Sequence, residues 1–279
     1  MQSIILYLTK ILSIDVAYFA KNSFWVSFRN GVGMIAGFLL SVAFARLASK
    51  TTYGQYTFVL SSMYLVNFLS VPRFDFALAQ AVANGADRSL LQTTRVSVMG
   101  SLLISLILLI VGKRYMYLGD PGLGHGFYWA ALLVPLLLGL NTFDAFLVGK
   151  KKFDWSARFA ALGSIGTAVG LITALWLHAQ VAYLVAVFVI VNGVLTGMLW
   201  WKTRTLMKND RTDPEVVGYG IYLTGLALMT MVASKLGNVL LSHFRGAEIL
   251  ATYAIAIIIP RAIQNLLQNL VDVAKMKLA

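Results

Sequence analysis

The stretch that decides the fold is Arg46–Ala83, RLASKTTYGQYTFVLSSMYLVNFLSVPRFDFALAQAVA. Its first part, Ser49–Gly54, gathers small and polar residues, and the glycine provides a backbone on which one helix can end and another begin. The apolar run that follows closes on Pro72, Arg73 and Asp75, which apolar helices rarely carry. The pattern predicts a short polar hairpin followed by one interrupted membrane helix.

The composition of the whole chain is that of a membrane protein. Its 279 residues are 59% hydrophobic and 12% charged, with a mean hydropathy of +0.77, whereas soluble domains average about 45–50% apolar and 25% charged residues. Helices are expected because a bilayer offers no water to backbone groups, and the alternating segments of a membrane β-barrel are absent. The net charge of +12 is attributed to basic residues that set the orientation in the membrane and contact anionic lipid. We expect no nucleic acid as partner.

Eight apolar stretches are long enough to be transmembrane helices. They run at about 24–45, 55–80, 94–112, 127–148, 156–177, 181–201, 218–241 and 251–273. Before them, 1–23 is expected to be an interfacial helix, because Ile4, Leu8 and Ile11 fall on one helical stripe. The expected fold class is an all-α membrane protein, a polytopic bundle of about eight transmembrane helices.

The basic residues of the loops set the expected orientation. Most cations outside the spans, among them Lys150–Lys152 and Lys202, fall on the side that holds both termini. The positive-inside rule makes that side cytoplasmic. No loop is long enough to form a separate domain.

An internal repeat divides the chain. Aligning Tyr56 with Tyr253 gives an offset of 197 residues, which lays the first span over 221–242. We therefore expect a six-helix bundle at 24–201, a cytoplasmic linker at 202–217 and the first two helices of a second bundle at 218–279. The competing interpretation is that any two apolar hairpins can be aligned through a tyrosine.

Three short motifs carry a family resemblance. Tyr53–Tyr56, Arg73–Leu78 and the basic-aromatic Gly149–Phe153 resemble the polysaccharide biosynthesis transporters, the O-antigen and exopolysaccharide flippases of the multidrug/oligosaccharidyl-lipid/polysaccharide exporter superfamily. Members typically carry Arg-Tyr-Glu where this chain has Arg-Phe-Asp. The resemblance implies twelve or more helices in two pseudo-symmetric bundles around a central cavity. With eight expected helices, the chain is interpreted as a short or truncated member.

Charged residues inside the spans are the candidate substrate-binding residues. A charge at a helix centre costs about 2.5–3.5 kcal/mol, so it should face protein, water or ligand. Arg261 lies about 15 Å into the last span, and Asn265 and Gln268 continue it as one polar stripe. The alternative for this stripe is a helix–helix seam. Arg29 and Lys235 lie nearer span ends, where lining a cavity and snorkelling to the surface are equally compatible.

Three further residues are gate candidates. Arg73 and Asp75 are two positions apart, and on a helix they would not face each other, so each is expected to need another partner. Asp272 lies at the cytoplasmic end of the last span. The resemblance to the family's Arg-aromatic-acid motif favours a structural or gating role over a simple mark of the headgroup boundary.

Enzyme chemistry finds little support in the sequence. His125, His178 and His243 are scattered without ligand spacing, the chain has no cysteine, and no G-x-x-x-x-G-K-[ST] phosphate-binding sequence occurs. We therefore expect no enzyme, no catalytic residue, no metal and no cofactor. Coupling to an ion gradient, of an ion that the sequence does not identify, is left open.

The resemblance implies a flippase. Such a protein moves a polyprenyl-pyrophosphate-linked oligosaccharide, an O-antigen or exopolysaccharide repeat unit, across the bacterial cytoplasmic (inner) membrane by alternating access, beside other polysaccharide-assembly proteins. A cationic cavity would suit the pyrophosphate. The alternatives left open are a multidrug-type or peptidoglycan-precursor exporter, an inactive truncated remnant and, less favoured, an integral-membrane glycan polymerase.

Overall fold

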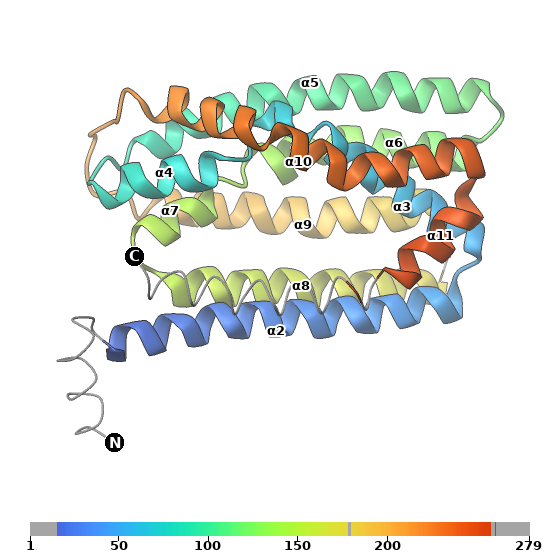
Figure 1. Cartoon of the computed structure of the whole chain (residues 1–279), viewed down its shortest axis with the longest axis horizontal. Coiled ribbons are helices and arrows are strands. Elements are labelled where there is room, and N and C mark those ends of the chain that lie inside the picture. Colours follow the sequence, from blue (N-terminus) through green and yellow to red (C-terminus); the bar gives the residue numbers. More distant parts are fainter. Residues whose placement is uncertain (1–15, 178–179, 258–259, 261–279) are drawn as a thin grey trace.

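The computed structural model describes residues 16–177, 180–257 and 260. Their regular structure is helical throughout, and the long helices run side by side along the long axis of the molecule (Figure 1). Among the described residues, six segments are long and apolar enough to cross a membrane. They are α2 (Val16–Leu47, with the candidate span Phe24–Leu47), α5 (Ser89–Tyr117), the composite Pro121–Gly149, α8 (Phe153–Leu177), α9 (Val181–Arg204) and α10 (Val216–Arg245). Together with the composition, they make the chain a multi-pass membrane protein.

The first helix is longer than the sequence predicted. It begins at Val16, eight residues before the expected start of the first span, so 16–23 continue α2 rather than forming part of a separate interfacial helix. The remainder of that expected helix, 1–15, lies outside the described residues. Helix α2 packs along α8 and lies at the edge of the bundle (Figure 1).

The second expected span is broken in two. It consists of α3 (Lys50–Leu65), a 3-10 turn η1 (Asn67–Ser70) and α4 (Phe74–Ala83). At the break Val71 has a φ of 52°, a left-handed conformation that is unusual for a β-branched residue, and Pro72 follows it without a backbone N–H. The predicted interruption is thus confirmed, and neither piece alone reaches the length of a membrane span.

Helix α5 stabilises this break. The Ser97 Oγ donates a hydrogen bond to the Ser70 carbonyl at 2.7 Å. A Cβ on Gly100 would stand 1.8 Å from the Leu69 carbonyl oxygen, so only glycine lets the two backbones approach this closely. Polar backbone groups at the break therefore find partners within the protein, as the interior of a bilayer requires.

The fourth span is also interrupted. It consists of α6 (Pro121–Val134), a π-helical turn η2 (Pro135–Gly139) and α7 (Phe143–Gly149). Pro135 cannot donate to the carbonyl four residues earlier, on Ala131, and the Ser105 Oγ donates to that carbonyl instead, at 2.6 Å. The turn redirects the chain, so α7 packs against α4 while α6 packs against α5 and α9.

The apolar core lies where α3, α5, α6 and α9 meet. Its fully buried side chains include Met63, Ile104, Phe127 and Leu184. These residues pack the helices around the two broken spans. Helix α2 contributes little to this core and lies at the edge of the bundle.

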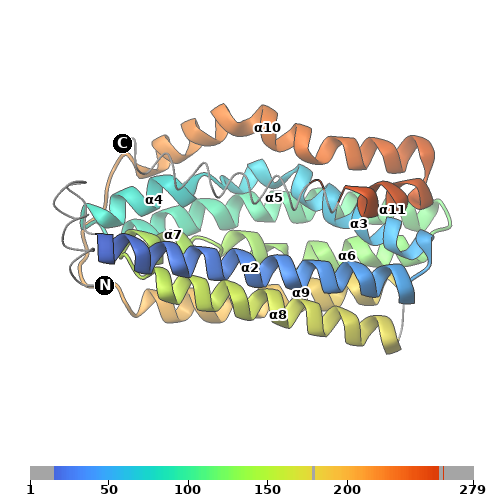
Figure 2. The ribbon, with the colours of Figure 1, turned by 60° about the horizontal axis from the view of Figure 1, so that its bottom comes forward.

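The last described helices pack on the broken span. Helix α10 lies along α3 and α4, and α11 (Ala247–Ala256) lies against α3 (Figures 1 and 2). Lys50 and Ala247 begin α3 and α11 at the expected offset, and Thr51 Oγ1 donates to Glu248 Oε1 at 3.1 Å across 197 positions. The repeat itself stays a prediction, because most of the eighth expected span lies outside the described residues.

Candidate functional site

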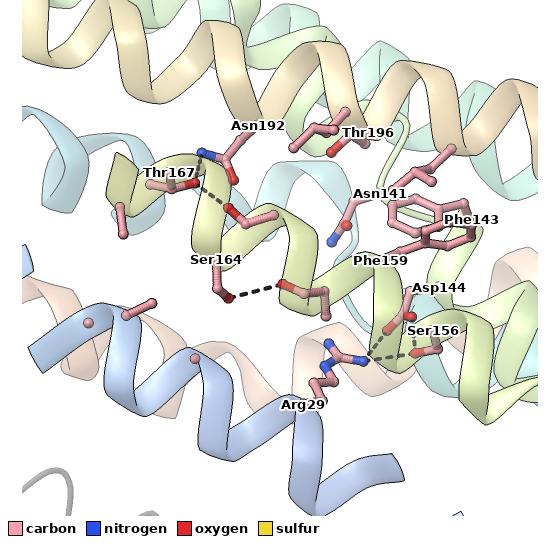
Figure 3. Close-up of a pocket in the computed structure, with 18 of the residues that line it drawn as sticks. Arg29, Asn141, Phe143, Asp144, Ser156, Phe159, Ser164, Thr167, Asn192 and Thr196 are labelled. Atoms are coloured by element: carbon pink, nitrogen blue, oxygen red, sulfur yellow. Dashed lines mark hydrogen bonds and ion pairs between the residues drawn. The ribbon is translucent and has the colours of Figure 1, made fainter. Parts of the chain in front are cut away.

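A cavity of about 400 Å³ opens between α2, α8 and α9 (Figure 3). Its volume falls within the range of about 300–1,000 Å³ that ligand pockets occupy. The α2 residues beside it are mostly small, and a Cβ built on Gly37 would meet no heavy atom within 4 Å. These small side chains keep the space open.

One end of the cavity carries a charged cluster, Arg29, Asp144 and Ser156. The Arg29 Nη1 donates to Asp144 Oδ2 at 2.9 Å and to Ser156 Oγ at 3.0 Å, and the Ser156 hydroxyl donates to the other carboxylate oxygen (Figure 3). The arginine and aspartate side chains are 40% and 28% exposed, so both remain accessible from the cavity. The pairing balances two charges that would each be unfavourable alone within a membrane helix bundle.

Two structural features bring these groups together. Arg29 extends from α2 towards the start of α8, where Ser156 lies. Asp144 lies in the first turn of α7, and the break at η2 gives that helix its own direction. The amino end of a helix also favours a carboxylate.

The rest of the cavity wall is polar but uncharged. The Asn192 Nδ2 donates to Thr167 Oγ1 at 2.9 Å, and Thr167 in turn donates to the Gly163 carbonyl (Figure 3). Asn141 and Ser164 add further amide and hydroxyl groups. Two phenylalanines, Phe143 and Phe159, also line the space. Amides, hydroxyls and aromatic faces together suit a ligand that is rich in hydroxyl groups.

A second cavity, of about 320 Å³, lies at the two helix breaks. Residues of both breaks line it, including Asn67, Ser70 and Thr142. Arg29, Asn141 and Asp144 line both cavities, so the Arg29–Asp144 pair stands between them. Breaks of this kind are where membrane transporters commonly place substrate or ion sites.

The residues predicted to bind substrate differ in what the structure says of them. Arg29 lines the cavity, which is one of its two expected positions. The Lys235 Nζ lies 5.6 Å from the ring centroid of Tyr64 on α3, and the residue does not border either cavity described above. Arg261, Asn265, Gln268 and Asp272 lie outside the described residues, so their roles stay predictions.

The expectation that Arg73 and Asp75 do not face each other is wrong. The Arg73 Nη1 lies 3.7 Å from Asp75 Oδ2. Arg73 precedes the first residue of α4 and has non-helical backbone angles, so the helical spacing rule does not apply to it. Its backbone N–H also donates to Thr224 Oγ1 of α10 at 3.4 Å, and Asp75 lines the second cavity. Their gating role stays a prediction.

Sequence reasoning missed most of the cavity wall. Asp144, Ser156, Thr167 and Asn192 are not among the residues predicted from the sequence. A signal existed for part of this set, because Ser156, Ser164 and Thr167 recur at helical spacing along α8.

Comparison with known proteins identifies a family. The family described as "Polysaccharide biosynthesis protein" matches residues 19–274. No curated protein and no solved structure matches the chain. Since the match spans all six candidate membrane helices, the chain belongs to the polysaccharide biosynthesis protein family.

Proposed function

We propose that the protein is a flippase of the bacterial cytoplasmic membrane, which moves a polyprenyl-pyrophosphate-linked oligosaccharide by alternating access. The observation that carries the proposal is the cavity between α2, α8 and α9, with a cationic group at one end and a neutral polar and aromatic wall beyond it. The family supplies the link to polysaccharide. A lipid-linked glycan has the matching parts, a pyrophosphate followed by hydroxyl-rich sugars.

Binding of the pyrophosphate would require Arg29 to change partner. Its guanidinium has five N–H donors, and Nη1 bonds to both Asp144 and Ser156. A pyrophosphate entering the cavity competes for the same donors through charge-assisted bonds, and Arg geometry favours phosphate oxygens. When Arg29 turns to the substrate, Ser156 still donates to Asp144, so the carboxylate keeps one hydrogen bond.

The same cluster argues against an exporter of cationic drugs. Such a substrate needs an acidic group in the cavity that is free to pair with it. Among the described residues, Asp144 is the one carboxylate that lines this cavity, and it is engaged by Arg29. A peptidoglycan precursor, which shares the pyrophosphate and the sugars, is distinguished from other lipid-linked glycans only by assay.

A pair of glycine substitutions tests whether the cavity is the transport site. Gly37→Leu adds side-chain volume at the cavity wall, and its Cβ would meet no heavy atom within 4 Å. Gly31→Leu adds the same side chain on the same helix, also with no atom within 4 Å, and lines neither cavity described above. We expect Gly37→Leu to reduce surface-glycan export at least roughly tenfold, with lipid-linked glycan accumulating in the inner leaflet, while Gly31→Leu exports normally. Equal export by the two variants at equal abundance would refute the proposal.

A second pair tests the role of the cationic group. Arg29→Gln removes the charge that binds the anion, whereas Asp144→Asn leaves Arg29 in place and removes its competitor. We expect Arg29→Gln to abolish export and Asp144→Asn to retain a substantial part of it. If the pair were only structural, the two variants would lose export alike.

A further inference from the structure

A second basic site lies where α8 begins and α9 ends. The Lys152 Nζ is 4.7 Å from the ring centroid of Trp155, and the Lys202 Nζ is 5.0 Å from the same centroid. We call these three residues the lysine–tryptophan cluster. Both ammonium groups are held by one indole ring, which fixes two otherwise flexible side chains near each other.

The two lysines lack an anionic partner within the described part of the chain. No ion pair involves Lys152 or Lys202 there, although Asp154 lies nearby in the first turn of α8. Lys150 shows the contrast, since its Nζ contacts the buried carboxylate of Asp87 at 2.6 Å. An ammonium group has three N–H donors, and a ring face cannot accept all of them. The cluster therefore presents two cations with donors available for an anion.

The cluster adjoins the cavity through one residue. The Lys202 Nζ lies 5.8 Å from the ring centroid of Phe159, and Phe159 lines the cavity. Ser156 of the charged cluster directly follows Trp155 in α8. The positive-inside rule expects this end of the bundle in the cytoplasm, and tryptophan at a span end typically lies at headgroup level. At that depth the abundant anions are lipid phosphates.

We propose that the lysine–tryptophan cluster binds the phosphate group of an anionic membrane lipid. The two ammonium groups bond to phosphate oxygens, and the indole ring that both of them contact excludes water from part of the site. The site is separate from Arg29 and does not depend on transport. Its ligand is either an anionic phospholipid or the diphosphate of a polyprenyl carrier, which share the phosphate chemistry.

The test measures lipid retention by the purified full-length chain. Native mass spectrometry is recorded after incubation with phosphatidylglycerol, with undecaprenyl diphosphate lacking sugar, and with zwitterionic phosphatidylcholine as background. The double variant Lys152→Gln/Lys202→Gln removes the site. Its matched control, Lys151→Gln/Lys208→Gln, removes two charges from exposed lysines at the same end of the bundle. Lys152→Arg/Lys202→Arg restores the charge, and elution as a single species in size-exclusion chromatography checks folding.

We expect the site variant to retain anionic lipid at least roughly tenfold more weakly, with the matched control and the arginine variant close to the parent. Preference for phosphatidylglycerol identifies a phospholipid site, and preference for the diphosphate identifies a carrier site. Equal loss in both lysine double variants would show bulk attraction to negative lipid and overturn the proposal. Retention of phosphatidylcholine equal to that of both anionic lipids would also overturn it. Normal glycan export by Arg29→Gln would refute the proposed function while leaving this result standing.

Discussion

Replacing Lys150 by Met should destabilise the protein more than replacing its partner. Asp87, in the turn between α4 and α5, has a side chain with 0% exposure, and Lys150 lies 2.6 Å from it with 20% exposure. The Lys208 backbone N–H donates to the other carboxylate oxygen at 2.8 Å. Methionine keeps the length of the lysine stem beside Phe146 but removes the charge, which leaves a buried carboxylate without a cation.

The magnitude follows from the geometry. At 2.6 Å and an effective dielectric constant of about 20, the gross attraction is about 6 kcal/mol. Removing one partner of a buried ion pair costs about 3–5 kcal/mol of stability. Because Asp87 keeps the hydrogen bond from the Lys208 N–H, we expect the loss for Lys150→Met to be about 3 kcal/mol, the lower end of that range. In Asp87→Asn the amide oxygen still accepts the hydrogen bond from the Lys208 N–H, and the Lys150 ammonium is exposed enough to extend into water. This variant should therefore lose only about 1 kcal/mol of stability. The double variant should be no less stable than Lys150→Met alone.

The assay is thermal unfolding in mild detergent, followed by intrinsic tryptophan fluorescence. About 1 kcal/mol corresponds to roughly 2–4 °C for chains of this size, so Lys150→Met should lower the midpoint by about 6–12 °C and Asp87→Asn by about 2–4 °C. Lys151→Met, at an exposed neighbour, is the matched control and should change little. If Lys150→Met matches Lys151→Met, or if both partners cost the same, the buried-charge reasoning fails.

Two other stability predictions rest on backbone geometry. Lys151 has a φ of 56°, so Lys151→Gly should relieve left-handed strain and raise the unfolding midpoint by roughly 2–4 °C, or about 1 kcal/mol; a lower midpoint would contradict this. A Cβ on Gly220 would lie 2.3 Å from the buried Phe74 ring, whereas one on Gly225 would meet nothing within 4 Å. Gly220→Ala should therefore destabilise the protein by about 1–3 kcal/mol in the same assay. Gly225→Ala should stabilise it by up to about 1 kcal/mol. If the two variants shifted the unfolding midpoint in the same direction, the contact between α4 and α10 would be refuted.

The helical architecture was largely predictable because apolar length and composition dominate it. Where boundaries were missed, the cause was local: α5 extends beyond its expected limits, 94–112, at both ends, because polar residues such as Ser89 and Tyr117 continue a helix beyond its most apolar part. The interruption near Pro72 could be anticipated from residue types. Its closure by Ser97 and Gly100 could not, since those contacts depend on which helix packs beside the break.

The candidate site was predictable only in part, for a similar reason. Arg29 stands out as a charge in an apolar helix, but its partner Asp144 lies 115 positions away. Their meeting depends on the turn at Pro135 and on the packing of α2 against α8, neither of which has a periodic signature. Neutral residues such as Asn192 carry no charge to mark them, and their role emerges only when three helices surround one space.

The break between α3 and α4 also constrains how the chain is inserted into a membrane. Lys50–Ala83 leaves the ribosome before α5, yet the hydroxyl that satisfies the Ser70 carbonyl belongs to Ser97. Exposed to lipid alone, the open carbonyl would be strongly unfavourable, so the broken segment can settle at its final depth only once α5 lies beside it. We therefore expect the broken segment, α3 and α4, to partition into the bilayer together with α5 as one unit.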